Sequence, residues 1–423
     1  MSRLLPLCAG LLAPAAAVAA SPTIESVVPA VGQAGKEFVV VLAGARLKEA
    51  REVVFYGTGL ECSKLVAASE NEVRATLRAS ADCPIGPHPF RVRTPGGLSE
   101  LKVVHVSPLP VVAEVETNDA PRSAQAIAPN TTVAGVIDSG DVDVFAVALR
   151  KGDRLSAEVQ AVRLGGEMTD AILTILGPRG EALATADDGP ITRQDPAASI
   201  VAPADGTYTI LIRETSFGGR PTSTYALHVG DFPRPSAVFP PGARSGRRAR
   251  LRLLGAPEPA IADVDVPGIA GPWWDYYPRL AGGPSPTPVP IRVRPYDGFD
   301  EPDLTEVGPP PASGVEAREW PVAFHGVIAG PGDVDAFAIK ARAGDRVRVE
   351  VFAARLGSPL DTVVEVLDGD GDLVARNDDD ASHDSRLIFK APADGTYRIV
   401  VADKRREGGR GFVYRVEVEE PRP

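Results

Sequence analysis

A short acidic segment carries the side chains of this sequence that are best suited to chemistry. Four of the six positions 114–119 are acidic or amide residues, and an aspartate pair follows downstream; the set is Glu114, Glu116, Asn118, Asp119, Asp141 and Asp143. In an extended segment alternate side chains share one face, so Glu114, Glu116 and Asn118 point the same way. Calcium takes about six to eight oxygen ligands, mainly carboxylates and carbonyls. These residues are therefore candidate calcium ligands; the alternative interpretation is a solvated acidic linker.

A calcium ion at this place would hold two parts of the chain together. If the linker folds back onto the segment that follows it, all six side chains can meet, and the ion would rigidify the junction. The second half of the chain repeats the aspartate pair as Asp333 and Asp335, but residues 311–319 supply only Glu316 and Glu319. We therefore expect no second calcium site.

Other acidic runs favour turns over metal binding. The run Asp368–Asp372 is similar to the start of an EF-hand loop, but Leu373 stands where that loop needs glycine. The corresponding segment in the first half, residues 177–180, is a plain Gly-Pro-Arg-Gly turn. We predict a hairpin turn here. The acidic loops 187–188 and 377–380 suit either Asx turns or a metal ion.

Aromatic residues concentrate at one place in the second half of the chain. Trp273, Trp274, Tyr276 and Tyr277 lie within five residues. Aromatic faces stack on sugar rings, so these four are candidate ligand-binding residues for a glycan. The alternative is a core or interdomain contact, the commoner role of large aromatic side chains.

Motifs of known catalytic sites are absent from the sequence. It contains no His-Glu-x-x-His, Gly-x-Ser-x-Gly or P-loop pattern, and its five histidines show no shared ligand spacing. The net charge of −11 argues against nucleic acid or an anionic membrane surface as a partner. We therefore expect a non-catalytic protein with no cofactor other than calcium.

The N-terminus has the pattern of an export signal. Arg3 precedes an apolar stretch at 4–13 and a small-residue cleavage site at 17–20, which predicts a signal peptide over residues 1–20. No later stretch has the length and apolarity of a membrane span. After cleavage Cys62 and Cys83 are the remaining cysteines, and an oxidising compartment predicts a disulfide between them. Two unlinked thiols are the alternative.

The chain repeats itself. The segment Gly140–Phe145 recurs at 332–337 with one change, and the seven residues Ala202–Tyr208 recur unchanged at 391–397. A fainter proline and glycine spacing links the segments that precede these copies. The order of modules is therefore A, B, A′, B′, with A′ the most eroded.

The local patterns are those of strands joined by turns. Short β-branched runs alternate polar and apolar residues, as in Arg346–Val351, and turn signals recur at the spacing of a sandwich. We predict an all-β protein of tandem β-sandwiches, immunoglobulin-like and jelly-roll-like. The predicted parts are the signal at 1–20, domains at 21–107, 112–230 and 231–298, a Pro-rich acidic linker at 299–314, and a last domain at 315–420.

Modules B and B′ resemble the bacterial pre-peptidase C-terminal domain family. The resemblance rests on Glu114-x-Glu116-x-Asn118-Asp119, on the Gly-Asp-Val-Asp-x-Phe box and on the Ala-Pro-Ala-Asp-Gly-Thr-Tyr turn. It implies non-catalytic jelly-roll-like sandwiches of exported bacterial proteins, some of which bind calcium near the acidic linker. Module A resembles an immunoglobulin-like IPT/TIG domain through its Pro29-x-x-Gly32 spacing, and A′ a degenerate copy without the cysteines.

Together these features predict a modular binding or spacer protein that is secreted, periplasmic or in the cell envelope. Its expected partner is an extracellular polymer, glycan or protein. Two alternatives remain open: an accessory or divergent member of a secreted peptidase system, and a purely structural envelope component.

Overall fold

The computed structural model describes residues 20–189, 191–255, 260–268, 271–280, 283–309, 315–380 and 382–421. The predicted export signal lies outside these residues except for its last position. Over the described part of the chain the regular structure is strand, apart from three short 3₁₀ turns, so the all-β prediction is confirmed. In the same residues there is no helix with the length and apolarity needed to cross a membrane.

The first domain is a β-sandwich with an immunoglobulin-type strand order. Its strands are β1 (Thr23–Val28), β2 (Val31–Gln33), β3 (Glu37–Ala45), β4 (Glu52–Phe55), β5 (Leu60–Ala67), β6 (Glu72–Ala79), β7 (Gly86–Thr94), β8 (Gly97–Leu98) and β9 (Lys102–Ser107). One sheet has the order β1-β3-β6-β5, and the other β2-β9-β7-β4 with β8 beside β7. Alternate side chains of each strand turn inward and form one core.

The second domain is a sandwich of two five-stranded sheets. Its elements are β10 (Val111–Ala113), η1 (Pro121–Ser123), β11 (Gln125–Ala126), β12 (Thr131–Val136), β13 (Asp143–Leu149), β14 (Arg154–Gln160), η2 (Val162–Leu164), β15 (Ala171–Leu176), β16 (Ala182–Ala186), β17 (Ala197–Val201), β18 (Gly206–Glu214) and β19 (Thr224–Gly230). The sheets run β10-β12-β19-β14-β17 and β11-β13-β18-β15-β16.

The fourth domain repeats this architecture. Its elements are β28 (Gly298–Asp300), β29 (Ala317–Arg318), β30 (Val322–Val327), β31 (Val334–Ala341), β32 (Arg346–Phe352), η3 (Ala354–Leu356), β33 (Thr362–Leu367), β34 (Leu373–Asn377), β35 (Arg386–Lys390), β36 (Gly395–Asp403) and β37 (Val413–Glu419). The sheets run β28-β30-β37-β32-β35 and β29-β31-β36-β33-β34. The shared strand order shows that the sequence repeat is a structural duplication, with Phe145 and Phe337 buried in the two cores.

The third domain is a smaller sandwich. Its strands are β20 (Ala237–Phe239), β21 (Gly242–Arg244), β22 (Arg248–Leu254), β23 (Ala260–Asp265), β24 (Trp273–Tyr276), β25 (Arg279–Leu280), β26 (Gly283–Pro284) and β27 (Val289–Arg294). Two three-stranded sheets, β20-β22-β23 and β21-β27-β24, face each other, and β25 and β26 form a separate hairpin.

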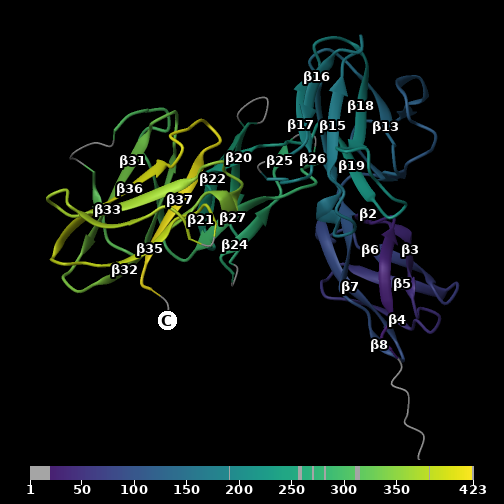
Figure 1. Ribbon diagram of the computed structural model, residues 1–423, viewed down its shortest axis with the longest axis horizontal. Helices are drawn as coiled ribbons and strands as arrows, with labels where there is room; N and C mark the ends of the chain where they lie inside the picture. The colour runs from purple at the N-terminus through teal and green to yellow at the C-terminus, as the bar shows by residue number, and fades with distance from the viewer. Residues whose placement is uncertain are drawn as a thin grey trace, which may run out of the picture.

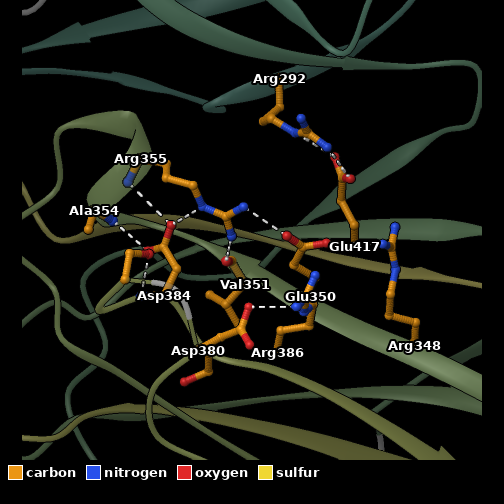
Figure 2. Close-up of polar contacts among 12 residues, drawn as sticks. Arg292, Arg348, Glu350, Val351, Ala354, Arg355, Asp380, Asp384, Arg386 and Glu417 are labelled. Carbon is orange, nitrogen blue, oxygen red and sulfur yellow. Dashed lines mark hydrogen bonds and ion pairs between the residues drawn. The ribbon is translucent and has the colours of Figure 1, made fainter. Parts of the chain in front are cut away.

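One arginine–aspartate contact explains why Arg-Leu-Gly recurs in the two larger domains. In the fourth domain, Arg355 donates from Nε to Asp384 at 2.6 Å and from Nη1 to Glu350 at 2.8 Å (Figure 2). Asp384 also accepts the backbone N–H groups of Ala353 and Ala354, which fixes the turn η3. The second domain makes the same contacts with its own copies of these residues.

Buried polar side chains close the three domain boundaries. Between the first two domains, Ser107 Oγ lies 2.8 Å from Thr132 Oγ1. Between the second and third, Gln160 Nε2 donates to Thr287 Oγ1 at 2.9 Å. Figure 1 shows the first two domains stacked at one side of the molecule, with the third and fourth extending from them to the other side. The third and fourth domains meet through Arg292, which contacts a glutamate of β37.

The boundary predicted before the last domain is wrong. Strand β28 pairs parallel with β30, and the N–H of Glu301 donates to the carbonyl of His325 at 2.9 Å. The fourth domain therefore begins near 298, inside the predicted linker 299–314, and not at 315. The acidic composition of this segment concealed an edge strand, because an edge strand needs few apolar residues.

The predicted disulfide is not formed, and both cysteines are free thiols. Cys62 lies at a register shift in β5, where its Sγ contacts the carbonyl of Lys64 at 3.3 Å. Cys83 lies in the loop between β6 and β7 with its Sγ 3.6 Å from Nε2 of His88. Burial raises the pKa of both thiols, and the alternative of two unlinked thiols describes the structure.

Candidate metal centre

Three carboxylates meet where the first linker joins the second domain. Ligand atoms of Glu114, Glu116 and Asp143 all lie within 4.8 Å of one another. Glu114 directly follows β10, whose parallel pairing with β12 carries the linker back onto the sandwich. Asp143 is the first residue of β13 in the facing sheet. The fold therefore brings linker and sandwich carboxylates together, as the sequence pattern predicts.

Glu114 is held by hydrogen bonds to both carboxylate oxygens. The Tyr225 hydroxyl donates to its Oε1 at 2.5 Å, and the N–H of Val136 donates to its Oε2 at 2.9 Å. A Cβ on Gly135 would lie 2.6 Å from the same Oε2 and 2.5 Å from the Tyr225 ring. Glycine at this position is therefore required for the carboxylate and the tyrosine to reach each other.

Asp143 supplies the feature that points most directly to a cation. Its side chain is 0% exposed, and neither of its carboxylate oxygens makes a hydrogen bond of standard geometry, although the Glu114 carboxylate and the Tyr225 hydroxyl interact with it. Burial, followed by the charges of Glu114 and Asp141, raises the pKa of Asp143 to about 10. A buried carboxyl group without well-formed hydrogen bonds is costly, and a cation would offset that cost.

Asn118 adds a neutral oxygen to the cluster. It is 0% exposed and donates from Nδ2 to Glu114 Oε1 at 3.3 Å, while its Oδ1 has no partner. Burial and the charges of Glu114 and Asp141 raise the pKa of Glu116. Oxygen donors from carboxylates and an amide, with excess negative charge, are the set that calcium prefers. The residues present fit a calcium ion.

The two remaining predicted ligands lie at the rim. Asp141 accepts the N–H of Val142 at 2.9 Å and lines an open cleft of about 390 Å³ together with Glu114, Glu116 and Asp138. Asp119 is exposed and stands outside the group of three carboxylates. Of the six predicted ligands, the structure therefore brings Glu114, Glu116, Asn118 and Asp143 together, and the sequence analysis missed Asp138.

The fourth domain repeats the geometry with a different outcome. Glu301 occupies the place of Glu114 and accepts the N–H of Val327 at 3.2 Å. Here the Tyr414 hydroxyl donates to Asp335 Oδ2 at 2.6 Å, whereas the equivalent Tyr225 hydroxyl donates to Glu114. Asp333 is likewise occupied by backbone N–H groups. The sequence analysis expected only Glu316 and Glu319 from residues 311–319 and did not consider Glu301, which is the carboxylate that lies beside Val327.

The acidic loop around Asp379 and the turn 368–372 have protein partners. Asp361, Asp379 and His383 lie close together, but Lys404 Nζ is 2.8 Å from Asp379 Oδ2 and supplies the positive charge. The run 368–372 forms the hairpin between β33 and β34, with Asp368 accepting backbone N–H groups within the turn. The predicted turn is confirmed.

The four aromatic residues of β24 and its end do not form one platform. Trp273 packs edge-on against Phe352 of the fourth domain, with ring centroids 5.9 Å apart. Trp274 and Tyr276 turn to the opposite face and join the core of the third domain. The Tyr277 hydroxyl donates to the carbonyl of Ile85 in the first domain at 2.7 Å. Trp273 and Tyr277 therefore join domains.

Tandem β-sandwiches with an acidic centre at the start of the second domain define a modular all-β protein. Residues 141–214 and 333–403 match the family described as bacterial pre-peptidase C-terminal domain. The chain therefore contains two domains of this family, as the sequence resemblance predicted. The IPT/TIG assignment of the first and third domains stays a prediction.

One curated relative and two solved structures show how far the likeness extends. The chain is 34% identical over 107 residues to a probable subtilase-type serine protease of Deinococcus radiodurans, a match that spans 24% of this chain and 15% of that protein. The pre-peptidase C-terminal domain of a Bacillus anthracis collagenase aligns at 13% identity and a TM-score of 0.21, covering 26% of this chain and all of that one. A Bacteroides ovatus mixed-linkage glucan utilization protein, SGBP-B, aligns at 10% identity and a TM-score of 0.20, over 95% of this chain and 75% of that one.

Proposed function

We propose that this chain is a non-catalytic binding and spacer protein of the extracellular or periplasmic space. Its four sandwiches hold their surface loops at set separations for a polymer, glycan or protein partner. The export pattern at residues 1–20 and the two pre-peptidase C-terminal domains support the location. A calcium ion held by the segment after β10 and by β13 would tie the start of the second domain to its sandwich.

The observation that carries the proposal is the closure of the domain boundaries by buried polar groups. Domains joined by a chain linker alone move relative to each other by default. In this chain Glu158 and Glu417 are 0% exposed, and each contacts a neighbouring domain. Such buried groups keep their partners only while the domains stay together. A spacer requires this stiffness.

The calcium proposal follows from the acidic centre. Glu114, Glu116, Asn118 and Asp143 would hold the ion, and its charge would offset the repulsion among these carboxylates. Three of these side chains belong to the segment that follows β10 and one to β13, so the ion would tie this segment to the sandwich. The calcium ion would have a structural role and no redox role.

Calcium should raise the unfolding temperature of the second domain. At a calcium concentration of about 100 times Kd, the stabilisation is about 2.7 kcal/mol, which corresponds to a few degrees in a thermal scan. Asp143→Asn should abolish the calcium-induced increase without lowering the stability of the calcium-free protein, because it removes a buried carboxyl group whose pKa burial and the charges of Glu114 and Asp141 raise. Differential scanning calorimetry with and without calcium measures both effects.

The matched control is Asp335→Asn in the fourth domain. Asp335 occupies the equivalent position but already accepts the Tyr414 hydroxyl, so its replacement should leave the calcium effect intact. An equal calcium shift in wild type and Asp143→Asn would contradict the proposed site.

Binding arrays separate the recognition role from a purely structural one. The purified chain is applied to immobilised glycans, collagens and other extracellular polymers. Saturable binding to one class supports the recognition role. The absence of saturable binding to any of them would favour the structural envelope component.

A second candidate role is an accessory one beside a secreted peptidase. The observation that favours it is the 34% identity to part of a probable subtilase-type serine protease. The match spans only 15% of the length of that relative. A zymogram with the purified chain tests for retained hydrolysis: no clearing supports the non-catalytic proposal, and clearing that one carboxylate substitution abolishes would overturn it.

A further inference from the structure

The third domain lacks counterparts of two edge strands of the first domain. In the first domain β5 covers the edge of β6, and β4 covers the edge of β7. The third domain has the same order up to that point, with β23 at the place of β6 and β24 at the place of β7. In the first domain residues 46–71 connect β3 to β6, whereas residues 255–259 connect β22 to β23. One lateral side of the third sandwich is therefore open among its described strands.

The missing strands leave inner side chains partly exposed. In β6 the inward residues Val73 and Ala75 are both 0% exposed. The corresponding inward residues of β23, Ala260, Ala262 and Val264, pack against the core of the third domain but are only half-buried. The open side therefore presents apolar surface that an additional strand would cover.

The backbone of β23 presents unpaired groups on the same side. The N–H of Val266 donates to the carbonyl of Arg247 at 2.9 Å, in register with the pairing of β22 and β23. Along an antiparallel pair, residues bonded to the partner strand alternate with residues whose N–H and C=O point away. The peptide groups of Ile261, Asp263 and Asp265 therefore face the open edge, where no other strand pairs within the described chain.

Side chains on the outer face of β23 indicate which charges an added strand beside it should carry. Asp263 and Asp265 are exposed and pair with Arg250 and Arg248 of β22 at 3.1 and 3.5 Å. A strand on the other side of β23 would place its outward residues directly beside these aspartates. Opposite charges across neighbouring strands stabilise a sheet, and like charges destabilise it. The complementary strand is therefore basic outward and apolar inward.

We propose that the third domain accepts an extended segment of a partner protein as an additional strand beside β23. The segment alternates apolar residues, which cover Ala260, Ala262 and Val264, with lysine or arginine residues, which lie beside Asp263 and Asp265. This mode of recognition adds a strand to an exposed sheet edge. The inference names one partner class for the proposed binding role and is independent of the calcium centre.

A fluorescent octapeptide of alternating valine and lysine tests the proposal on the full chain. Fluorescence anisotropy should show saturable binding, at least ten-fold tighter than binding of the matching valine–glutamate peptide. Hydrogen exchange of residues 260–265 should slow when the valine–lysine peptide is bound. Absence of binding, or equal affinity for the two peptides, would overturn the proposal while leaving the calcium result unaffected.

Two variants assign the binding to this edge. Asp263→Pro removes an outward N–H without breaking the pairing to β22, since proline is tolerated where an edge N–H faces solvent. The double variant Asp263→Lys with Asp265→Lys keeps the backbone and should reverse the preference toward the glutamate peptide. The control Asp370→Lys with Asp372→Lys makes the same charge change in a distant turn and should bind like wild type.

Two outcomes with these variants would contradict the assignment of binding to the edge of β23. The first is unchanged affinity for the valine–lysine peptide in the Asp263/Asp265 double variant. The second is a dimer of the free chain in sedimentation that Asp263→Pro dissociates, because a second copy of the chain would then be the natural occupant of the edge.

Discussion

Replacing Glu417 by alanine should lower the free energy of unfolding of the fourth domain by about 3–5 kcal/mol, the usual cost of removing one partner of a buried ion pair. Glu417 is fully buried and accepts hydrogen bonds from Arg292 Nη2 at 2.7 Å and Arg415 Nε at 2.9 Å (Figure 2 shows the contact with Arg292). Without it, two nearly buried guanidinium groups lose their counter-ion. Because Arg292 belongs to the third domain, the same change weakens the joint between the last two domains.

Glu365→Ala is the matched control for this measurement. Glu365 pairs with Arg376 at 3.1 Å on the surface of the same domain, where the arginine side chain is 54% exposed. Exposed pairs contribute about 0–1 kcal/mol, so this variant should unfold close to wild type. Urea denaturation followed by tryptophan fluorescence compares the two variants, and equal small losses would contradict the role of Glu417.

Replacing Glu158 by alanine should open the joint between the second and third domains. Glu158 is 0% exposed and contacts Arg163 of its own domain, Arg234 of the connecting segment and Thr287 of the third domain. Although burial raises the pKa of Glu158, Arg234 and Arg163 hold it at about 2. Removal of this charge leaves Arg234 buried without a counter-ion, at a cost of about 3–5 kcal/mol.

The fourth domain offers a control for the Glu158 variant. Glu350 pairs with Arg355 in the same way that Glu158 pairs with Arg163. Unlike Glu158, which also contacts Thr287 of the third domain, Glu350 pairs with residues of its own domain. Both alanine variants should lose stability, whereas only Glu158→Ala should broaden the small-angle scattering envelope and speed protease cleavage of residues 231–236. Equal cleavage rates in the two variants would show that Glu158 does not hold the joint.

The fold was predictable because its signals are local. Alternation along each strand places apolar side chains on one face, and the repeated Gly-Asp-Val-Asp-x-Phe box places Phe145 and Phe337 in two equivalent cores. The start of the fourth domain was missed because β28 is a three-residue edge strand within an acidic run. Pairing with β30 defines this strand, and pairing is not visible in local composition.

The candidate site was predictable in part for the same reason. Glu114, Glu116 and Asn118 alternate within one segment, so their shared face follows from the extended backbone. Tyr225 donates to Glu114 from 111 residues away, and no local pattern pairs the two. In the second domain the tyrosine donates to the glutamate, and in the fourth domain it donates to the aspartate. This difference depends on tertiary contacts alone.

For the cysteines, the sequence predicted a contact that the structure does not contain. Their even number and expected export predicted a bond between Cys62 and Cys83, but a disulfide also needs two suitably placed Cβ atoms. The structure directs Cys62 to the carbonyl of Lys64 and Cys83 to His88. An oxidising compartment and an even number of cysteines are therefore insufficient to establish a disulfide.

Calcium titration of the full chain by isothermal calorimetry tests the central claim most directly. Wild type should bind one ion per chain and release a proton, because burial and the charges of Glu114 and Asp141 raise the pKa of Asp143 and calcium binding displaces protons from its ligands. The affinity should therefore rise as the pH rises from 6 toward 9. Asp143→Asn should bind no calcium and Asp335→Asn one ion. Binding of one ion by Asp143→Asn, or of none by wild type, would contradict the calcium centre.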